Sequence, residues 1–363
     1  MRFPEFLKDN GTIEFVSPSF SASREPYRSA FNESLKVWKA HGYHTILGPN
    51  TYVSNGIGIS NTPKLCAKEL MDAYVNSDSD VIISCGGGEL MCEILSFMDF
   101  DVIKKSKPKW YLGYSDNTNF TFLLTTICDV ASIYGPCAAT FGMKPWHPAL
   151  EHAYELFTGK RTSVENFDYY EIEGLKDEEH PFEPYNCTEK VDIKAYTPTG
   201  VEDVIAAGGA CCAENDYQLT ASVYMEGRLI GGCMDCLVNL LGTRFDHVSD
   251  FINKYKDDGI IWYLEACDLN VFSIRRAMWQ MHEAGWFKYV KGFIFGRPYN
   301  GEDMFNLNHY EAVLPIACGV NHVPAIVDAD VGHLPPQMPL VNGALAKVDY
   351  IDGSLKIDMD LVN

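Results

Sequence analysis

The sequence predicts an α/β fold, in which an N-terminal domain with a parallel sheet and helices on both faces precedes a smaller mixed α+β C-terminal domain. Two observations predict it. Short apolar runs alternate with segments of helical periodicity in the first part of the chain, as they do in parallel sheets. The later part mixes strand types and closes on a hairpin turned at Asp352-Gly353. With 363 residues, the chain is long enough for two such domains.

The N-terminal elements are expected to alternate along the chain. Strands are predicted over residues 12–17, 45–47, 81–85 and 110–114, and helices over residues 25–41, 63–75 and about 117–128. Ligands of such sheets bind beyond the carboxyl ends of the strands. Glycines 86–88 and Ser115 each follow a predicted strand, so these two loops are candidates for one site.

A break in this pattern divides the chain. Between residues 159 and 200 the sequence becomes acidic, aromatic and proline-containing, which is typical of a segment that connects domains. We predict a first domain over residues 1–160, a connecting segment over 161–200 and a second domain over 201–363. In the second domain we expect helical segments over 231–243, 273–284 and 309–317, and strands over 259–264, 292–295 and 325–327.

Composition narrows the functional classes. The formal net charge of −20 and the lack of basic clusters argue against nucleic acid and anionic membrane surfaces as partners. No apolar run approaches the roughly 20 residues that cross a bilayer, and no secretory signal is visible. The 12 cysteines lack regular spacing, which favours free thiols in a reducing compartment. We therefore expect a cytoplasmic protein that acts on a small substrate.

The segment around Ser115 predicts a strand, a tight turn at residues 113–116 and then a helix. α/β hydrolases present a nucleophilic serine in this way, with the unpaired N–H groups of the helix start facing the turn. The second glycine of the usual Gly-x-Ser-x-Gly motif is missing. The alternative is that Ser115 or Asp116 is only the N-cap of the helix.

A serine nucleophile needs a base, and the base needs a hydrogen-bond acceptor. His333 lies in a glycine-proline loop after an apolar strand, where a rigid scaffold can aim an imidazole. Glu265 ends an apolar strand, and a buried carboxylate there requires a partner. The alternative for Glu265 is a structural ion pair with Arg275 or Arg276.

Three other patterns admit competing interpretations. Cys85 could be a nucleophile at a strand end or a buried packing thiol. Glycines 86–88 could cradle a phosphate, although Glu89 then stands where an anion would prefer positive charge. Cys233 and Cys236 have the spacing of a redox or zinc half-site, but no second pair accompanies them, so core packing is favoured over metal binding.

Five motifs in order along the chain resemble those of the LD-carboxypeptidase family of serine peptidases, which also contains the microcin C immunity peptidases. The motifs are Gly86-Gly87, Gly113-Tyr114-Ser115-Asp116 with Thr118, residues 229–232 running to Gly242-Thr243, Leu264-Glu265 with Arg276, and Gly332-His333. Residues 16–19 resemble the opening strand and turn of the family. The resemblance covers about residues 12 to 343 apart from the connecting segment.

The resemblance implies a Ser-His-Glu triad that acts by acyl transfer. Ser115 would be the nucleophile, His333 the general base and then acid, and Glu265 the orienting carboxylate. It implies an enzyme that cleaves an amide bond near the C-terminus of a small peptide, with a role in peptidoglycan recycling. It also implies a homodimer that needs no metal or organic cofactor.

The family also implies an oxyanion hole made by the backbone N–H groups of Asp116 and of Gly87 or Gly88. Departures from the muropeptide-cleaving pattern at Cys85, Gly88 and Cys233 leave the leaving group open. Tyr134-Gly135-Pro136 is more similar to the microcin-immunity branch, which hydrolyses aminoacyl or peptidyl nucleotide amides. A non-catalytic small-ligand-binding protein is the alternative from a different class.

Overall fold

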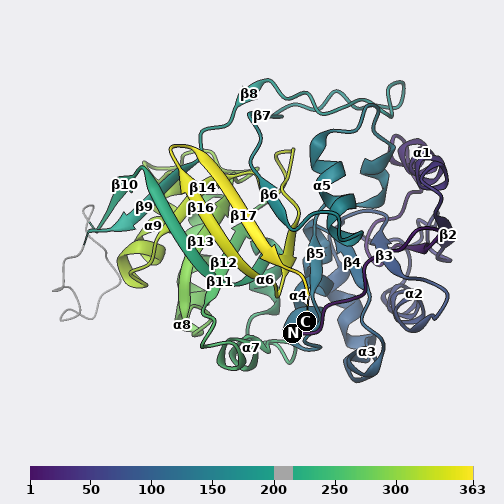
Figure 1. Cartoon of the computed structure of the whole chain (residues 1–363), viewed down its shortest axis with the longest axis horizontal. Coiled ribbons are helices and arrows are strands. Elements are labelled where there is room, and N and C mark those ends of the chain that lie inside the picture. The colour runs from purple at the N-terminus through teal and green to yellow at the C-terminus, as the bar shows by residue number, and fades with distance from the viewer. Residues whose placement is uncertain (200–215, 363) are drawn as a thin grey trace.

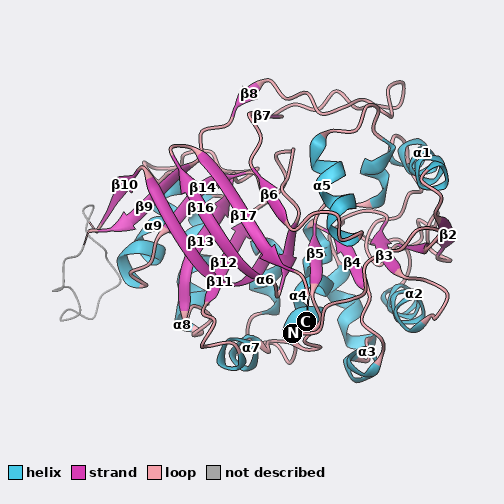
Figure 2. Cartoon of the chain, in the orientation of Figure 1, coloured by secondary structure: helices cyan, strands magenta, loops and turns pink. Residues whose placement is uncertain are grey.

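A computed structural model describes residues 1–199 and 216–362 of the chain (Figure 1). The last residue of the predicted connecting segment and the first residues of the predicted second domain, 200–215, lie outside the described residues. Two large sheets lie side by side in Figure 1 and are flanked by helices (Figure 2). The mixed α/β architecture predicted from the sequence is confirmed.

The first sheet has six strands in the order β15-β5-β4-β3-β1-β2. Its strands from the N-terminal part are β1 (Thr12–Val16), β2 (His44–Leu47), β3 (Val81–Ser84), β4 (Trp110–Gly113) and β5 (Ser132–Tyr134). These five strands pair in parallel. The sixth strand, β15 (Leu340–Asn342), comes from the C-terminal part and pairs antiparallel to β5.

Helices cover both faces of the first sheet. The helices of this part are α1 (Tyr27–Ala40), α2 (Pro63–Val75), α3 (Phe100–Lys105), α4 (Thr118–Thr126) and α5 (Pro148–Phe157), with shorter turns η1 (Met91–Phe97), η2 (Ser115–Asn117) and η3 (Ala138–Gly142). One apolar cluster joins Ile82 and Tyr111 of the sheet to α2, α3 and α4. A second joins Ile83 and Leu112 to α1 and α5. Because successive strand residues point to opposite faces, both faces of β3 and β4 are buried.

The second sheet has nine strands in the order β10-β9-β14-β13-β12-β11-β16-β17-β6. Its strands are β6 (Ser163–Glu165), β9 (Lys194–Pro198), β10 (Tyr217–Thr220), β11 (Ser222–Cys233), β12 (Ile260–Glu265), β13 (Val290–Gly296), β14 (Ala325–Ala329), β16 (Leu345–Ile351) and β17 (Ser354–Asp360). The strands β11 to β14 are parallel. Antiparallel strands extend the sheet at both edges.

The remaining elements accompany the second sheet. They are α6 (Met234–Leu240), α7 (Val248–Lys254), α8 (Val271–Glu283), α9 (His309–Leu314), the turn η4 (Pro315–Val320) and the small hairpin of β7 (Tyr169–Tyr170) and β8 (Glu189–Lys190). Within residues 1–199 and 216–362, no helix has the length and apolar character that a membrane span requires.

One predicted element is wrong. Residues 231–243 were expected to be helical, but Gly231 and Gly232 lie in β11, which ends at Cys233, and the helix begins only at Met234. A Cβ atom on Gly231 would lie 1.7 Å from the carbonyl oxygen of Tyr263 in the neighbouring strand. Gly231 therefore serves the close approach of β11 to β12. Gly232, with a φ angle of 142°, serves the close approach of β11 to Thr118 of α4, 2.8 Å from where its Cβ atom would stand. Sequence periodicity does not distinguish such a glycine pair from a helix start.

Candidate active site

Ser115 stands at the turn between β4 and α4. The residue is partly exposed, although the strand before it and the helix after it are buried. Its φ angle of 62° lies in the left-handed region, which costs an L-residue about 1 to 2 kcal/mol. Such strain at a strand-to-helix turn lifts a side chain clear of the backbone, as in a nucleophile elbow.

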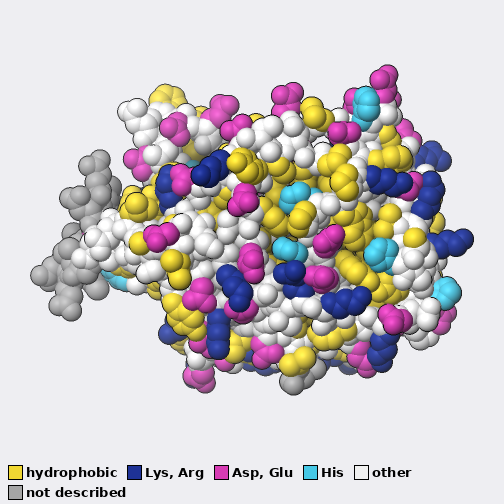
Figure 3. All heavy atoms as spheres, turned by 45° about the horizontal axis from the view of Figure 1, so that its top comes forward, with side chains coloured by type: hydrophobic (Ala, Val, Ile, Leu, Met, Phe, Trp, Pro, Cys, Tyr) yellow, Lys and Arg dark blue, Asp and Glu magenta, His cyan; other side chains and the backbone are white. Residues whose placement is uncertain are grey.

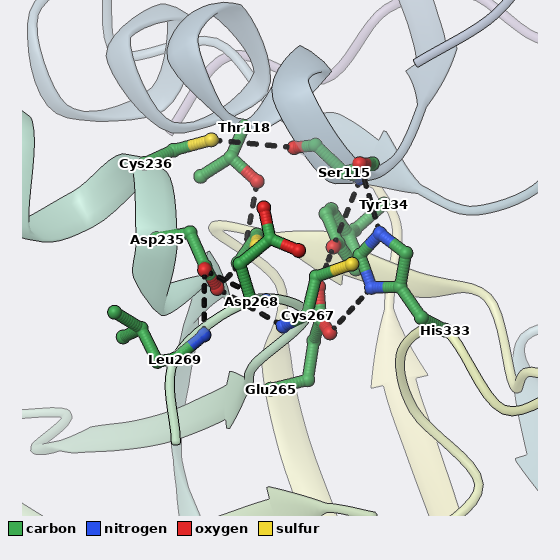
Figure 4. Close-up of polar contacts among 11 residues, drawn as sticks. Ser115, Thr118, Tyr134, Asp235, Cys236, Glu265, Cys267, Asp268, Leu269 and His333 are labelled. Carbon is green, nitrogen blue, oxygen red and sulfur yellow. Dashed lines mark hydrogen bonds and ion pairs between the residues drawn. The ribbon is translucent and has the colours of Figure 1, made fainter. Parts of the chain in front are cut away.

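The structure brings Ser115, His333 and Glu265 together (Figure 4). His333 Nε2 lies 2.8 Å from Ser115 Oγ, and His333 Nδ1 lies 2.8 Å from Glu265 Oε2. The three residues come from the ends of β4 and β12 and from the loop after β14. One imidazole thus links a hydroxyl to a carboxylate through its two nitrogens.

Glu265 is 1% exposed and its carboxylate is held on both oxygens. Besides His333, it accepts a hydrogen bond of 2.5 Å from the hydroxyl of Tyr134. Arg275 and Arg276 bind elsewhere, to the carbonyl of Glu311 and the hydroxyl of Ser273. The alternative ion pair is therefore wrong.

Tyr134 contacts two members of this arrangement, and the sequence reasoning did not select it. Its hydroxyl accepts the N–H of Ser115 at 3.1 Å and donates to Glu265. A single buried side chain on β5 therefore joins the serine backbone to the carboxylate. The only available signal was its place in Tyr134-Gly135-Pro136, which gives no hint of this contact.

The charges of His333 and Glu265 stabilise each other. Burial alone would lower the pKa of His333, but attraction to Glu265 and hydrogen bonds to Cys267 and Glu265 hold it well above its ordinary value. Burial alone would raise the pKa of Glu265, but the charge of His333 and hydrogen bonds from His333 and Tyr134 hold it below its ordinary value. The carboxylate is thus placed to stabilise a protonated imidazole.

Gly332 permits the close approach of the histidine loop to the carboxylate. Its φ angle is 116°, and a Cβ atom there would lie 2.7 Å from Glu265 Oε2. The ring of His333 also packs against Tyr114, with ring centroids 5.3 Å apart. The loop thereby fixes the imidazole from two sides.

Among the described residues, the glycine loop and the serine turn carry unpaired backbone N–H groups. A Cβ atom on Gly87 would lie 3.2 Å from Ser115 Oγ, so a larger residue there would crowd the hydroxyl. The N–H groups of Gly87, Gly88 and Asp116 donate to no acceptor in the described part of the chain. Unpaired N–H groups beside a serine hydroxyl can stabilise an oxyanion.

The side chain of Asp116 has a structural role in this arrangement. Its buried carboxylate accepts hydrogen bonds from the hydroxyl of Ser19, the N–H of Met91 and the amide of Asn119. It therefore ties the serine turn to the segments before and after the glycine loop. Residues 86–88 lead into the turn η1, which begins at Met91, so the helix start that a phosphate cradle at Glu89 would require is absent there.

The cysteines near the site are free thiols. Cys85 is 2% exposed and burial raises the pKa of its thiol, which disfavours the thiolate that nucleophilic attack needs. Cys233 and Cys236 are buried as predicted, but they also line a cavity beside Ser115.

Cys233 Sγ lies within 4.8 Å of ligand atoms of Glu265 and His333. Three donors of these types could hold a metal ion. However, both imidazole nitrogens of His333 already engage Glu265 and Ser115. The side chains thus fit a hydrogen-bonded triad better than a metal centre.

Comparison with known proteins gives the class of the protein as a two-domain peptidase. A sequence model of the LD-carboxypeptidase N-terminal domain matches residues 13–135, and one of the LD-carboxypeptidase C-terminal domain matches residues 226–348. The chain belongs to the LD-carboxypeptidase family of serine peptidases. The predicted resemblance is confirmed.

Several relatives match over nearly their whole length. The Escherichia coli "Microcin C7 self-immunity protein MccF" is 24% identical over 95% of this chain and 92% of its own. The Bacillus subtilis protein named "Putative carboxypeptidase YocD" is 23% identical over 98% of each chain.

Solved structures share the fold. MccF in complex with aspartyl sulfamoyl adenosine aligns over 100% of both chains, with a TM-score of 0.78 and 19% identity. An MccF-like protein from Bacillus anthracis aligns over 99% of this chain with a TM-score of 0.75 and 20% identity. At these identities the alignments establish the architecture alone.

Proposed function

We propose that the protein hydrolyses an amide bond near the C-terminus of a small peptide, as an LD-carboxypeptidase-type enzyme with a Ser115-His333-Glu265 triad. The observation that carries the proposal is the chain of contacts from Ser115 Oγ to His333 and on to Glu265, each of 2.8 Å. Membership of a peptidase family supports the same reaction class.

In the proposed first step, Ser115 Oγ attacks the substrate carbonyl carbon while His333 Nε2 takes the hydroxyl proton. The N–H groups of Asp116 and of Gly87 or Gly88 stabilise the oxyanion, and one such donor typically contributes about 3 to 4 kcal/mol. His333 then returns its proton to the leaving nitrogen, the C–N bond breaks and an acyl-enzyme forms.

Water then attacks the acyl carbon while His333 Nε2 takes its proton. The ester C–O bond to Ser115 breaks, His333 returns the proton to Ser115 Oγ, and the product carboxylic acid leaves. Glu265 keeps the Nδ1–H of the imidazole oriented and offsets its charge in both steps. Tyr134 acts as a positioning residue, because it binds Glu265 and the N–H of Ser115. The proposed chemistry uses side chains and backbone N–H groups alone.

A second candidate is hydrolysis of an aminoacyl or peptidyl nucleotide amide. The match to MccF over 95% of this chain favours it, since MccF has been crystallised with aspartyl sulfamoyl adenosine. The two candidates share one mechanism and differ in the leaving group. In both, the proposed partner is a small substrate.

On the face shown in Figure 3, basic side chains are interspersed with acidic ones.

Parallel incubations test both candidates. The wild-type protein and Ser115→Ala are incubated with a tetrapeptide ending in D-alanine and with aspartyl sulfamoyl adenosine, and the products are identified by mass. We expect at least one substrate to be cleaved by the wild type and neither by Ser115→Ala. Equal cleavage by the two proteins would contradict the role of Ser115.

A homodimer, a cytoplasmic location and the domain limits 1–160, 161–200 and 201–363 remain predictions from the sequence. Sedimentation at several protein concentrations would test the dimer. A monomer at every concentration, with full activity, would contradict it.

A further inference from the structure

The loop that carries His333 is fastened on both sides of that residue. Three residues before it, the carboxylate of Asp330 accepts the backbone N–H of Phe167 at 2.7 Å. Two residues after it, the carbonyl oxygen of Pro335 accepts the backbone N–H of Glu171 at 2.7 Å. One short stretch of chain therefore holds both ends of the segment on which the imidazole stands.

A buried ion pair anchors the same carboxylate. Arg297, which follows β13, donates from one nitrogen to the carboxylate of Asp330 and from another to the carbonyl oxygen of Asp328. Asp330 and Arg297 are 0% and 6% exposed, so each charge depends on the other rather than on water. Burial raises the pKa of Asp330, and the charge of Arg297 opposes the rise. The pair is a fixed link between β13 and the histidine loop.

The guanidinium of Arg297 also contacts the stretch that fastens the loop. The ring of Tyr170 in β7 lies over it, with the ring centroid 4.2 Å from the guanidinium carbon, which is a cation–π contact. Within residues 1–199 and 216–362, Nε of Arg297 has no hydrogen-bond partner. A buried ion pair with an unpaired donor is costly to stability. Such an arrangement is a candidate for a role in geometry rather than in stability.

We propose that Asp330 and Arg297 are positioning residues for His333. They hold its imidazole in line with Ser115 and Glu265. The inference rests on the proposed function and deepens it, because it makes a buried ion pair part of the arrangement that aligns the base. Only two residues separate Asp330 from His333, so a shift of the anchored end reaches the ring, and small misplacements of a catalytic group are costly to turnover.

A second arginine–aspartate pair provides a matched control. Arg228 donates to the carboxylate of Asp258 at 2.8 Å and to the carbonyl oxygen of Gly343, and its guanidinium carbon lies 4.1 Å from the ring centroid of Tyr255. Both members of this pair are half-buried. The pair lies at the start of β12, whereas Glu265 ends that strand. The control thus repeats the contacts of the first pair away from the triad.

The first measurement follows the imidazole and needs no turnover. Isotopically labelled histidine is incorporated into the wild type, Asp330→Asn and Asp258→Asn. The NMR signal of His333, assigned by its absence in His333→Gln, is titrated between about pH 5 and pH 9. Burial lowers the pKa of His333 and contact with Glu265 more than offsets it. We expect this pKa to fall in Asp330→Asn, because the displaced ring loses part of that contact, and to be unchanged in Asp258→Asn.

A second pair of variants separates position from charge. Arg297→Lys keeps both charges but replaces the planar fork of arginine by one ammonium group, which cannot serve Asp328 and Asp330 in the same way. The pKa of His333 should therefore fall in Arg297→Lys and stay unchanged in Arg228→Lys. If Asp330→Asn does not fold, this pair of variants decides. The other titratable groups near the imidazole are the same in all of these proteins, and they are Tyr114, Cys267 and Glu89.

Turnover is measured on the same proteins with the better substrate of the two incubations. In Asp330→Asn and Arg297→Lys, kcat should fall at least about tenfold, while KM changes less than about threefold. The reason is that a misaligned base slows the chemical step without removing a contact to the substrate. Asp258→Asn and Arg228→Lys should keep kcat within about twofold of the wild type.

Wild-type values of kcat and of the His333 pKa in folded Asp330→Asn and Arg297→Lys would overturn the inference. So would equal changes in the variants of the Arg228 pair, since any broken ion pair would then act alike.

The inference and the proposed function fail separately. If the wild type hydrolyses a substrate and both variants of the Arg297 pair keep its kcat, the proposed function stands and the positioning role is wrong. If the His333 pKa falls in those variants alone but the wild type cleaves neither substrate, the positioning role stands and the proposed hydrolase is wrong.

Discussion

Replacing Glu265 by glutamine changes the charge beside His333 with little change in side-chain size. The wild-type carboxylate is 1% exposed and lies 2.8 Å from Nδ1. An amide at this position can turn its NH₂ group toward Nδ1 and favour the wrong imidazole tautomer. In other serine-hydrolase triads the corresponding amide substitution lowers kcat about 10⁴-fold. We expect a loss of that order in Glu265→Gln.

The substitution should also move the acid limb of the pH profile. His333 must be neutral to accept a proton, so wild-type activity falls as the pH drops through a His333 pKa held well above 6.5. An opposite charge at contact distance shifts a pKa by about 1 to 3 units, or about 1.4 to 4 kcal/mol. Without that charge, burial dominates and lowers the pKa, so the limb should fall below pH 6.5.

The measurement is kcat/KM between about pH 5 and pH 9 for the wild type and Glu265→Gln, with the better substrate of the two incubations. Tyr134→Phe is the control, because it keeps the carboxylate and should keep its acid limb above pH 6.5. An acid limb in Glu265→Gln that stays at the wild-type pH, or rises, would refute the assigned charge coupling.

Three further predictions follow from the same geometry. Ser115→Gly and Ser115→Ala should both lose turnover by about 10⁴- to 10⁶-fold. Urea unfolding should show Ser115→Gly to be about 1 kcal/mol more stable than Ser115→Ala, because glycine relaxes a φ angle of 62°. Equal stability of the two variants would contradict the backbone strain at residue 115. Gly332→Ala should lower the free energy of unfolding by about 1 to 3 kcal/mol and reduce activity. The control Gly353→Ala, where the added Cβ atom meets open space, should keep its activity. Equal losses of activity in the two variants would argue against the close approach of Gly332 to Glu265. Tyr134→Phe should cost about 1 to 3 kcal/mol of stability in urea unfolding and lower kcat more than it raises KM; a change in KM alone would place Tyr134 in substrate binding instead.

The elements of the first sheet and its helices could be predicted from short-range sequence patterns. The apolar runs and helical periodicities of the first sheet are short-range signals, and helix α2 has the predicted bounds of residues 63–75. Ser115 stood out because its turn lies between a buried strand and a buried helix. His333 and Glu265 were selected as strand-end residues whose types require a partner, and the family resemblance joined them.

Contacts between distant segments could not be predicted in this way. Tyr134 reads as one apolar residue of a short strand, and its two hydrogen bonds depend on where β12 and the serine turn lie in space. Gly231 reflects the spacing of β11 from β12, and Gly232 reflects the approach of β11 to Thr118 of α4. The cavity beside Ser115 likewise depends on loops that meet only in the folded chain, because its lining residues Glu89 and Asp268 are far apart in the sequence.

Strand β15 has a consequence for how the protein can be made. It completes the first sheet by pairing Leu340 with Tyr134 and Asn342 with Ser132, and Asn342 also accepts hydrogen bonds from Gly231 and Tyr263 of the second sheet. During synthesis, β5 therefore has β4 as its only neighbour in the sheet until about 340 residues have been translated. If the N-terminal and C-terminal halves are expressed from separate genes, the N-terminal fragment should expose the unpaired edge of β5 and aggregate. Co-expression of both fragments should be needed to recover activity.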